Sequence, residues 1–261
     1  MLDNILTAFL YFLGMGIAFI PLERSFLCTQ SDIFRKEWFT DVLFYFGQSL
    51  IWNFVTLLVL NYIFGFLPNT KLRGLREIFQ STHIVFQFFI LIFLGDLFIY
   101  WAHRLQHRIN FLWKFHRVHH TAETVDYIAA FREHPLDNIY TRGIESLPAF
   151  LLGFKLEQIT AFVAFRGVWA LFIHSNVNLR FGVLEALFGS PHLHHWHHDL
   201  KKGGDCNYAN LFPLMDILFG TYYNPKEASE QFGIEEDYKR GYISLLLEPL
   251  LPTFLRSKVW K

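Results

Sequence analysis

The chain has 261 residues, the size of one large domain, and 52% of them are hydrophobic. This share exceeds that of ordinary soluble domains, and the 31 phenylalanines gather in long apolar stretches, so the sequence predicts a protein embedded in lipid. The formal net charge is zero, from 23 basic and 23 acidic side chains, which excludes the electrostatic footprint of a nucleic-acid-binding protein. The two distant cysteines, Cys28 and Cys206, suggest neither a disulfide framework nor a thiolate metal site.

Three apolar stretches before residue 103 are long enough to cross a membrane as helices. They run from Ile5 to Leu22, from Val42 to Leu67 and from Ile84 to Ala102, and the third is interrupted only by Asp96. No basic residue precedes the first stretch and no small-residue cleavage site follows it, so we interpret it as a spanning helix rather than a signal peptide.

A fourth apolar region runs from Leu147 to Phe154 and from Leu156 to Ile173, and Lys155 divides its two parts. Clusters of histidines lie before and after this region. If both clusters bind the same metals, they lie on one side of the membrane, so the chain between them crosses an even number of times. We therefore expect a two-helix hairpin, spanning or re-entrant. The charges of the connecting segments favour a cytosolic location for the histidines.

Strand signals are weak throughout, and no internal repeat or linker divides the chain. The sequence thus predicts an all-α, polytopic membrane protein with about four transmembrane or re-entrant segments and a cytosolic helical cap that carries the histidines. We expect one domain over residues 1–261: N-terminal spans in 1–83, a histidine-rich core in 84–224 and a cytosolic or interfacial segment in 225–261. The apolar run from Ile243 to Leu251 in this last segment favours a helix on the membrane surface or over the site.

His103 and His107 lie four residues apart at the end of the third stretch, so they project from one helical face. Asp96 and Tyr100 precede them on the same face. An aspartate inside a span costs about 2.5–3.5 kcal/mol and normally has a partner, and a ligating histidine commonly donates its second N–H to a carboxylate. We therefore expect Asp96 to orient a histidine, and we count Asp96 and Tyr100 as catalytic residues. A polar contact between helices is the alternative for Asp96.

The pattern His-x-x-His-His occurs twice, and on a helix it places its three imidazoles on one stripe. The two triplets comprise His116, His119 and His120, and then His194, His197 and His198. With His103 and His107 they make eight imidazoles, too many for one tetrahedral ion but suited to two. Imidazole alone does not choose between zinc, copper, iron and nickel. A metal-buffering surface or a pH sensor is the alternative, but such surfaces use loose tracts rather than helical spacing.

The other histidines are more ambiguous. His134 and His174 lie on the expected side of the site, and each could be a metal ligand or a structural residue. We expect His192 and His195 to be outer-shell or surface residues. His83 precedes the third stretch on the opposite side of the membrane, so we exclude it.

These motifs resemble the histidine boxes of the fatty acid hydroxylase superfamily, also called the sterol desaturase family. The resemblance covers about residues 90–224 and rests on three boxes and the segment from Asp205 to Thr221. The boxes are Asp96…Tyr100-Trp101-x-His103-Arg104-x-x-His107, His116-Arg117-Val118-His119-His120 and Ser190-Pro191-x-x-His194-x-x-His197-His198.

The resemblance implies two non-haem iron ions, which zinc could replace in a purified form, and dioxygen as the oxidant. It implies hydroxylation or desaturation of an unactivated C–H bond in a sterol, fatty acyl, ether-lipid or carotenoid substrate taken from the bilayer. His134 and His174 also lie where many family members carry histidine. The membrane would be the endoplasmic reticulum of a eukaryote or the inner membrane of a bacterium.

No haem-binding or flavin domain is recognisable, so we expect a separate electron donor of the cytochrome b5, ferredoxin or reductase type. Basic residues near the site could dock an acidic carrier or contact lipid headgroups; they are Arg104, Arg108, Lys114, Lys201 and Lys202. Two other functions stay open. A zinc membrane hydrolase would use the same histidines without oxygen, and a non-enzymatic transporter or metal sensor should carry its ionisable residues at mid-membrane depth.

Overall fold

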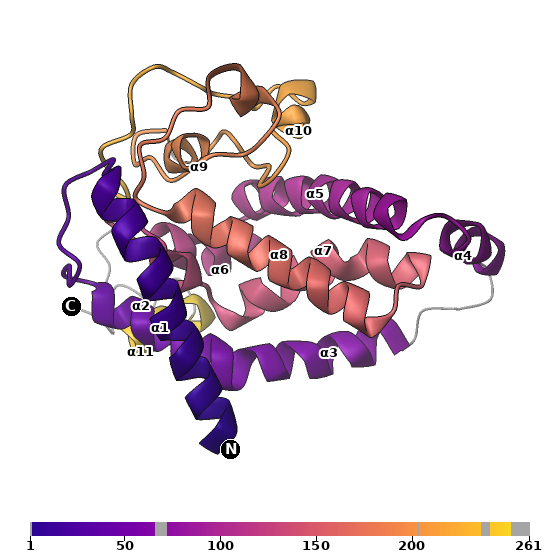
Figure 1. Cartoon of the computed structure of the whole chain (residues 1–261). Helices are drawn as coiled ribbons and strands as arrows, with labels where there is room; N and C mark the ends of the chain where they lie inside the picture. Colours follow the sequence, from indigo (N-terminus) through magenta and orange to yellow (C-terminus); the bar gives the residue numbers. More distant parts are fainter. Residues whose placement is uncertain (1, 66–71, 203, 236–240, 252–261) are drawn as a thin grey trace.

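The computed structural model describes residues 2–65, 72–202, 204–235 and 241–251, and its architecture there is helical (Figure 1). Two isolated β-bridges, Leu27–Val177 and Asp199–Phe232, are the only extended pairings in these ranges. The predicted all-α fold is confirmed. In chain order the helical segments are α1 Leu2–Ser25, α2 Trp38–Gly47, η1 Gln48–Trp52, α3 Asn53–Gly65, α4 Arg73–Gln80, α5 Ile84–Arg108, α6 Asn110–His120, η2 Ala129–Phe131, α7 Pro135–Leu152, α8 Leu156–His174, η3 Gly182–Ala186, α9 Pro191–His197, α10 Leu214–Leu218, α11 Tyr242–Leu247 and η4 Glu248–Leu250.

Three of these helices are long and apolar enough to cross a membrane: Leu2–Ser25, Trp38–Gly65 and Ile84–Arg108. The second joins α2 and α3 through the π-helical segment η1. The three helices correspond to the three predicted spans, although residues 66 and 67 of the second prediction lie outside the described ranges. Large apolar side chains on these helices are exposed, among them Phe9, Leu57 and Phe89. Such surfaces suit lipid rather than water, so the chain is a membrane protein.

Helices α7 and α8 form the expected two-helix hairpin, and its turn is made by Gly153 in the left-handed conformation at a φ of 75°. Helix α7 begins well before the apolar run from Leu147, and its earlier part carries polar side chains, such as Asp137 and Glu145, that are buried inside the protein. Helix α8 returns along α7 and ends at His174, next to α9 (Figure 1). The hairpin therefore brings the chain back to the end of the bundle that holds α6.

The central core joins α5, α7 and α8. Leu91, Ala149 and Phe162 are fully buried in one cluster that also includes Leu211. Gly95 allows the close approach of α8, because a Cβ atom there would lie 2.6 Å from Cζ of Phe162. This packing fixes how far α5 and α8 are shifted along each other, and each of them carries a histidine in its last turn.

The C-terminal segment packs against α2 and α6. Leu245 of α11 lies in a buried cluster with Phe44 and Val118, and Nη2 of Arg117 donates to both carboxylate oxygens of Glu248, at 2.7 and 2.8 Å. The expected apolar helix from Ile243 therefore covers the α6 side of the bundle, while residues 236–240 and 252–261 of this segment lie outside the described ranges.

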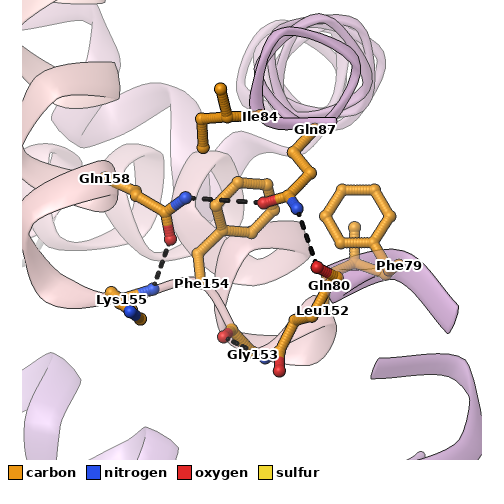
Figure 2. Close-up of a pocket in the computed structure, with 9 residues that line it drawn as sticks. All are labelled: Phe79, Gln80, Ile84, Gln87, Leu152, Gly153, Phe154, Lys155 and Gln158. Atoms are coloured by element: carbon orange, nitrogen blue, oxygen red, sulfur yellow. Dashed lines mark hydrogen bonds between the residues drawn. The ribbon is translucent and has the colours of Figure 1, made fainter. Parts of the chain in front are cut away.

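A hollow of about 340 Å³ lies at the opposite end of the bundle, where α4 and α5 meet the turn between α7 and α8 (Figure 2). Its polar groups bind one another. Nε2 of Gln158 donates to Oε1 of Gln87 at 3.5 Å, and Nε2 of Gln87 donates to the carbonyls of Gln80 and Thr82 at 3.3 and 2.9 Å. The backbone N–H of Lys155 donates to Oε1 of Gln158 at 2.9 Å. The amides of this hollow thus complete their hydrogen bonds within the protein.

Candidate metal centre

All of the histidines expected as ligands except His134 gather in two groups, and within each group the candidate ligand nitrogens lie within 4.8 Å of one another. The first group consists of His103, His107, His116, His120 and His197. The second group consists of His119, His174, His194 and His198. The groups adjoin, since the rings of His120 and His198 stack with centroids 4.4 Å apart. The arrangement offers two adjoining sets of ligands, each of which could hold a metal ion.

The two His-x-x-His-His triplets divide between the groups in opposite ways. In α6, His116 and His120 belong to the first group and His119 to the second. At α9, His197 belongs to the first group, whereas His194 and His198 belong to the second. Each triplet therefore contributes to both groups, which makes the two groups one structural unit.

Local structure at the start of α9 fixes the third box. Ser190 is the N-cap, and its hydroxyl accepts the N–H of Leu193 at 3.3 Å. Pro191 occupies the first turn, where its lack of an N–H does no harm. Gly204, at a φ of 71°, lies against His107, because a Cβ atom there would be 2.5 Å from Cε1 of that ring. The chain after α9 thus confines a histidine of α5.

Hydrogen bonds orient three rings of the first group. The Nδ1 atoms of His103 and His197 lie 2.8 Å from the carbonyls of Tyr208 and Cys206. A carbonyl only accepts, so each Nδ1 carries the hydrogen and each Nε2 has a free lone pair.

The third oriented ring is that of His116, whose Nδ1 donates to Oδ2 of Asp137 at 2.9 Å. The Nε2 atoms of all five rings of the first group are buried without a hydrogen-bond partner in the described structure. Buried polar atoms normally have partners. Five ring nitrogens without partners, at least three of them lone pairs, fit a cation.

Short nitrogen–nitrogen contacts in the second group also indicate a cation site. Nδ1 of His119 donates to the carbonyl of Arg132 at 3.2 Å, and Nδ1 of His174 donates to that of Ala170 at 2.7 Å. In the neutral rings both Nε2 atoms then carry lone pairs, yet they lie 2.9 Å apart. Two lone pairs cannot form a hydrogen bond with each other. A cation between them removes the repulsion.

Further contacts in this group have the spacing of ligands around one ion. Nε2 of His194 lies 2.9 Å from that of His174 and 3.1 Å from that of His198. Metal–nitrogen bonds of about 2.1 Å that meet at a right angle place their nitrogens about 3.0 Å apart. The second group therefore fits one metal ion, and the first group fits another.

Burial keeps the imidazoles in the form that binds metal. Desolvation lowers the pKa of His116 to about 4. Desolvation, together with repulsion between neighbouring histidines, lowers the pKa of His119, His120 and His198 well below the usual value of 6.5. A histidine must be neutral to bind a metal, and these rings are neutral at pH 7.

Several predicted residues lie outside the two groups. Both ring nitrogens of His134 are engaged: Nδ1 accepts the N–H of Leu136 and Nε2 donates to the carbonyl of Leu246, each at 3.1 Å. His134 is the N-cap of α7 and has no lone pair left for a metal. His192 and His195 are buried rather than at the surface, and their Nε2 atoms donate to backbone carbonyls.

Asp96 and Tyr100 have partners other than histidine. Asp96 is fully buried and receives Nη1 of Arg166 at 2.7 Å, and its carboxylate also accepts two backbone N–H groups of the segment after α9. The hydroxyl of Tyr100 lies 2.9 Å from that of Thr221 and accepts Nη1 of Arg104 at 2.9 Å. The carboxylate that holds a histidine of the groups is that of Asp137, at the start of α7.

Asp137 and Arg166 are the site residues that the sequence motifs did not single out. Arg166 had a visible signal, because it is a charge within the fourth apolar region, and charges in such segments normally have partners or functions. Asp137 had no comparable signal. It lies three residues after His134, in a polar stretch where an acidic residue is ordinary.

A cavity of about 80 Å³ opens between the two histidine groups and the α7–α8 hairpin. Histidines of both groups line it, including His103 and His119. Charged residues of the hairpin and its entry line the remainder: Glu133, Arg142, Glu145 and Arg166. A molecule in this cavity would touch both groups at once.

Residues 88–221 match the model of the fatty acid hydroxylase family. An ornithine lipid hydroxylase of Rhizobium tropici is 32% identical over 64% of this chain and 51% of its own length. The alkylglycerol monooxygenase of Homo sapiens is 33% identical over 50% of this chain and 29% of its own length, and a Delta(7)-sterol 5(6)-desaturase of Gibberella zeae is 31% identical over 65% and 48%.

The chain spans about half the length, or less, of these curated relatives. No solved structure matches the chain. The family match covers half of the chain, from α5 to the segment after α10. All nine histidines of the two groups lie within it: eight belong to the three histidine boxes, and the ninth is His174. The chain belongs to the fatty acid hydroxylase family.

Proposed function

We propose that the chain is a membrane-bound oxygenase that uses dioxygen and external electrons to hydroxylate or desaturate a C–H bond of a lipid. The observation that carries the proposal is the convergence of nine imidazoles, eight of them buried, in two adjoining groups whose ring nitrogens face one another. The relatives' names describe hydroxylation, monooxygenation and desaturation of lipids, which supports the same class of reaction.

The nine histidines of the two groups are the proposed ligands of two iron ions, which would supply the activation of dioxygen and the removal of hydrogen from carbon. The protein's own part is to hold the rings. The carbonyls of Tyr208 and Cys206 and the carboxylate of Asp137 fix which nitrogen faces inward. Such outer contacts orient a ligand and raise its basicity. Burial of the rings keeps water from the reacting atoms.

One observation favours iron over a zinc hydrolase. Catalytic zinc sites have three protein ligands and an open position, whereas the first group alone offers five imidazoles. A transporter is also disfavoured, because the one acidic residue deep in a span, Asp96, is held in an ion pair with Arg166. That pair leaves Asp96 no free carboxylate oxygen for a moving ion, since both oxygens accept hydrogen bonds.

The proposed substrate enters from the bilayer and the proposed electrons come from a separate protein of the cytochrome b5, ferredoxin or reductase type. Arg108 and Lys201 are exposed near the box histidines and offer positive charge for such a carrier. The site would face the cytosol, at the endoplasmic reticulum of a eukaryote or the inner membrane of a bacterium.

The test is metal analysis of the full chain purified without oxygen, with lipidomics of cells that express the wild type or His119→Ala. We expect two iron ions per wild-type chain and an oxidised lipid that disappears in the variant. His83→Ala is the matched control, because His83 caps the opposite end of α5 through its bond to the N–H of Val85. Two zinc ions without iron from iron-replete cells, and lipids identical in the two strains, would overturn the proposal.

A further inference from the structure

Arg166 of α8 has one nitrogen without a partner. The residue is 3% exposed. Its Nη1 donates to Asp96 at 2.7 Å and its Nε to Glu145 at 2.8 Å. Its Nη2 is buried and has no hydrogen-bond acceptor in the described structure. Leaving a buried donor of a charged group unpaired is costly, so this nitrogen calls for an acceptor from outside the described residues.

The acceptor would lie beside the histidines. Arg166 lines the 80 Å³ cavity together with His103 of the first group and His119 of the second. A single water needs about 10–15 Å³ of such space. The cavity therefore has room for a short piece of a larger molecule, held by Arg166 at one side and facing the histidines at the other.

The charges around Arg166 indicate what kind of acceptor fits. Two buried carboxylates, Asp96 and Glu145, pair with two guanidinium groups, the half-buried Arg142 and the buried Arg166, through contacts of 2.7 to 2.8 Å. Glu133 lines the cavity as well. An anionic ligand bound to Arg166 would lie beside these two carboxylates and the carboxyl group of Glu133. An uncharged oxygen gives Nη2 its acceptor without that repulsion.

We propose that Nη2 of Arg166 donates to an uncharged oxygen of the lipid substrate, in a hydroxyl, an ether or the carbonyl of an ester or amide. This oxygen lies within a few bonds of the carbon that is oxidised. The inference rests on the proposed oxygenase function and adds a substrate class to it. Because the oxygen is anchored, the enzyme oxidises one position of the chain rather than several.

The first measurement uses the wild type alone. The oxidised lipid that depends on His119 is fragmented by tandem mass spectrometry, which locates the new hydroxyl group or double bond. We expect a single positional isomer with an uncharged oxygen within a few bonds of the new group. Oxidation in mid-chain, remote from any oxygen, overturns the inference while leaving the oxygenase function intact. Absence of any oxidised lipid overturns the function and the inference together.

The second measurement compares Arg166→Lys with Arg180→Lys. Lysine keeps the positive charge near Asp96 and Glu145 but lacks the three-nitrogen fork. We expect Arg166→Lys to bind the wild-type amount of iron, to form about tenfold less product and to spread it over several positions. Arg180 makes a similar two-bond pair with Glu185, away from the cavity, so its variant should give the wild-type isomer.

If Arg166→Lys formed about tenfold less product but only the wild-type isomer, Arg166 would merely support the fold. That result would overturn the inference. If Arg166→Lys binds no iron, the wild-type isomer from the first measurement still decides the question.

Discussion

The two ends of the helical bundle both contain polar hollows, but among the described residues only one hollow is lined by buried side-chain atoms without hydrogen-bond partners. At the end near α4, the hollow of about 340 Å³ is lined by glutamine amides that bind one another and the backbone (Figure 2). At the end near α6 and α9, the cavity of about 80 Å³ is lined by imidazoles and a guanidinium group with unpaired nitrogens. Of these two hollows, the smaller one therefore has the buried polar atoms that need partners from outside the described residues.

The difference follows from the chemistry of the side chains. An amide both donates and accepts, so Gln158 and Gln87 can satisfy each other. An imidazole whose Nδ1–H is already donated offers only a lone pair, and a guanidinium group offers only donors. The histidines therefore require a cation and Arg166 an acceptor, and the described residues provide neither. The polar groups at the end near α4 bind one another, whereas those at the end near α6 and α9 are arranged to bind a metal ion and a ligand.

Asp137→Asn should have the largest effect of the changes that sharpen this contrast. Both carboxylate oxygens accept, one from His116 at 2.9 Å and one from Gln106 at 2.6 Å. Asparagine has one NH₂ group in place of one oxygen, so it can accept from only one of these two donors. If the NH₂ group faces His116, that ring loses its acceptor. If it faces Gln106, the N–H groups of the two amides oppose each other. Loss of such an outer contact lowers metal affinity or activity about 10–100-fold. Metal titration and lipid oxidation should both fall by that factor.

Glu185→Gln is the control for this change, because Glu185 is also a buried carboxylate with several donors but lies outside the cavity. It should retain wild-type metal content. Wild-type metal affinity in Asp137→Asn would show that the contact with His116 does not matter for binding.

Spacing along helices predicted which histidines gather in the candidate metal centre, but not how they divide between its two groups. A repeated His-x-x-His-His predicts one stripe of imidazoles on a helix, and both stripes do face the centre. Which ring of α6 joins which ring of α9 depends on how the two helices approach each other. Hence the opposite division of His119 and His197 between the groups could not be predicted from either motif.

Tertiary packing also decided the partners of single residues. Asp96 was expected beside a histidine of its own helix face, but Arg166 reaches it from α8, seventy residues further along the chain. His134 and His174 looked alike in sequence. One caps α7 and the other ends α8 next to α9, so only His174 is brought to the centre. The spans were predictable because their apolar length alone determines them.

Gly204→Ala should have an intermediate effect, through a steric contact rather than a lost hydrogen bond. The new Cβ would lie 2.5 Å from Cε1 of His107 and must displace that ring. We expect metal bound by the first group to fall about tenfold in affinity, toward the lower end of the range for disturbed ligands. Metal titration by absorption or calorimetry would measure it.

Gly220→Ala controls for backbone strain in this experiment. Gly220 has a φ of 73°, almost that of Gly204, but a Cβ there meets nothing within 4 Å. Both variants should lose similar stability, on the order of 1–2 kcal/mol for a left-handed residue with a side chain. Only Gly204→Ala should lose metal. Equal metal loss in both would assign the effect to strain.

Gln158→Ala should have the smallest effect on function and tests the comparison of the two ends directly. It removes hydrogen bonds to Gln87 and Lys155, so the free energy of unfolding should fall by about 1 kcal/mol. Iron content and product formation should stay within about twofold, since no partner of Gln158 faces a histidine. Gln106→Ala is the matched change at the near end, where the amide donates to Asp137 at 2.6 Å. A similar loss of stability should there come with weaker iron binding. If Gln158→Ala lowered product as much as Gln106→Ala, the hollow near α4 would belong to the functional site, and the contrast between the two ends would be lost.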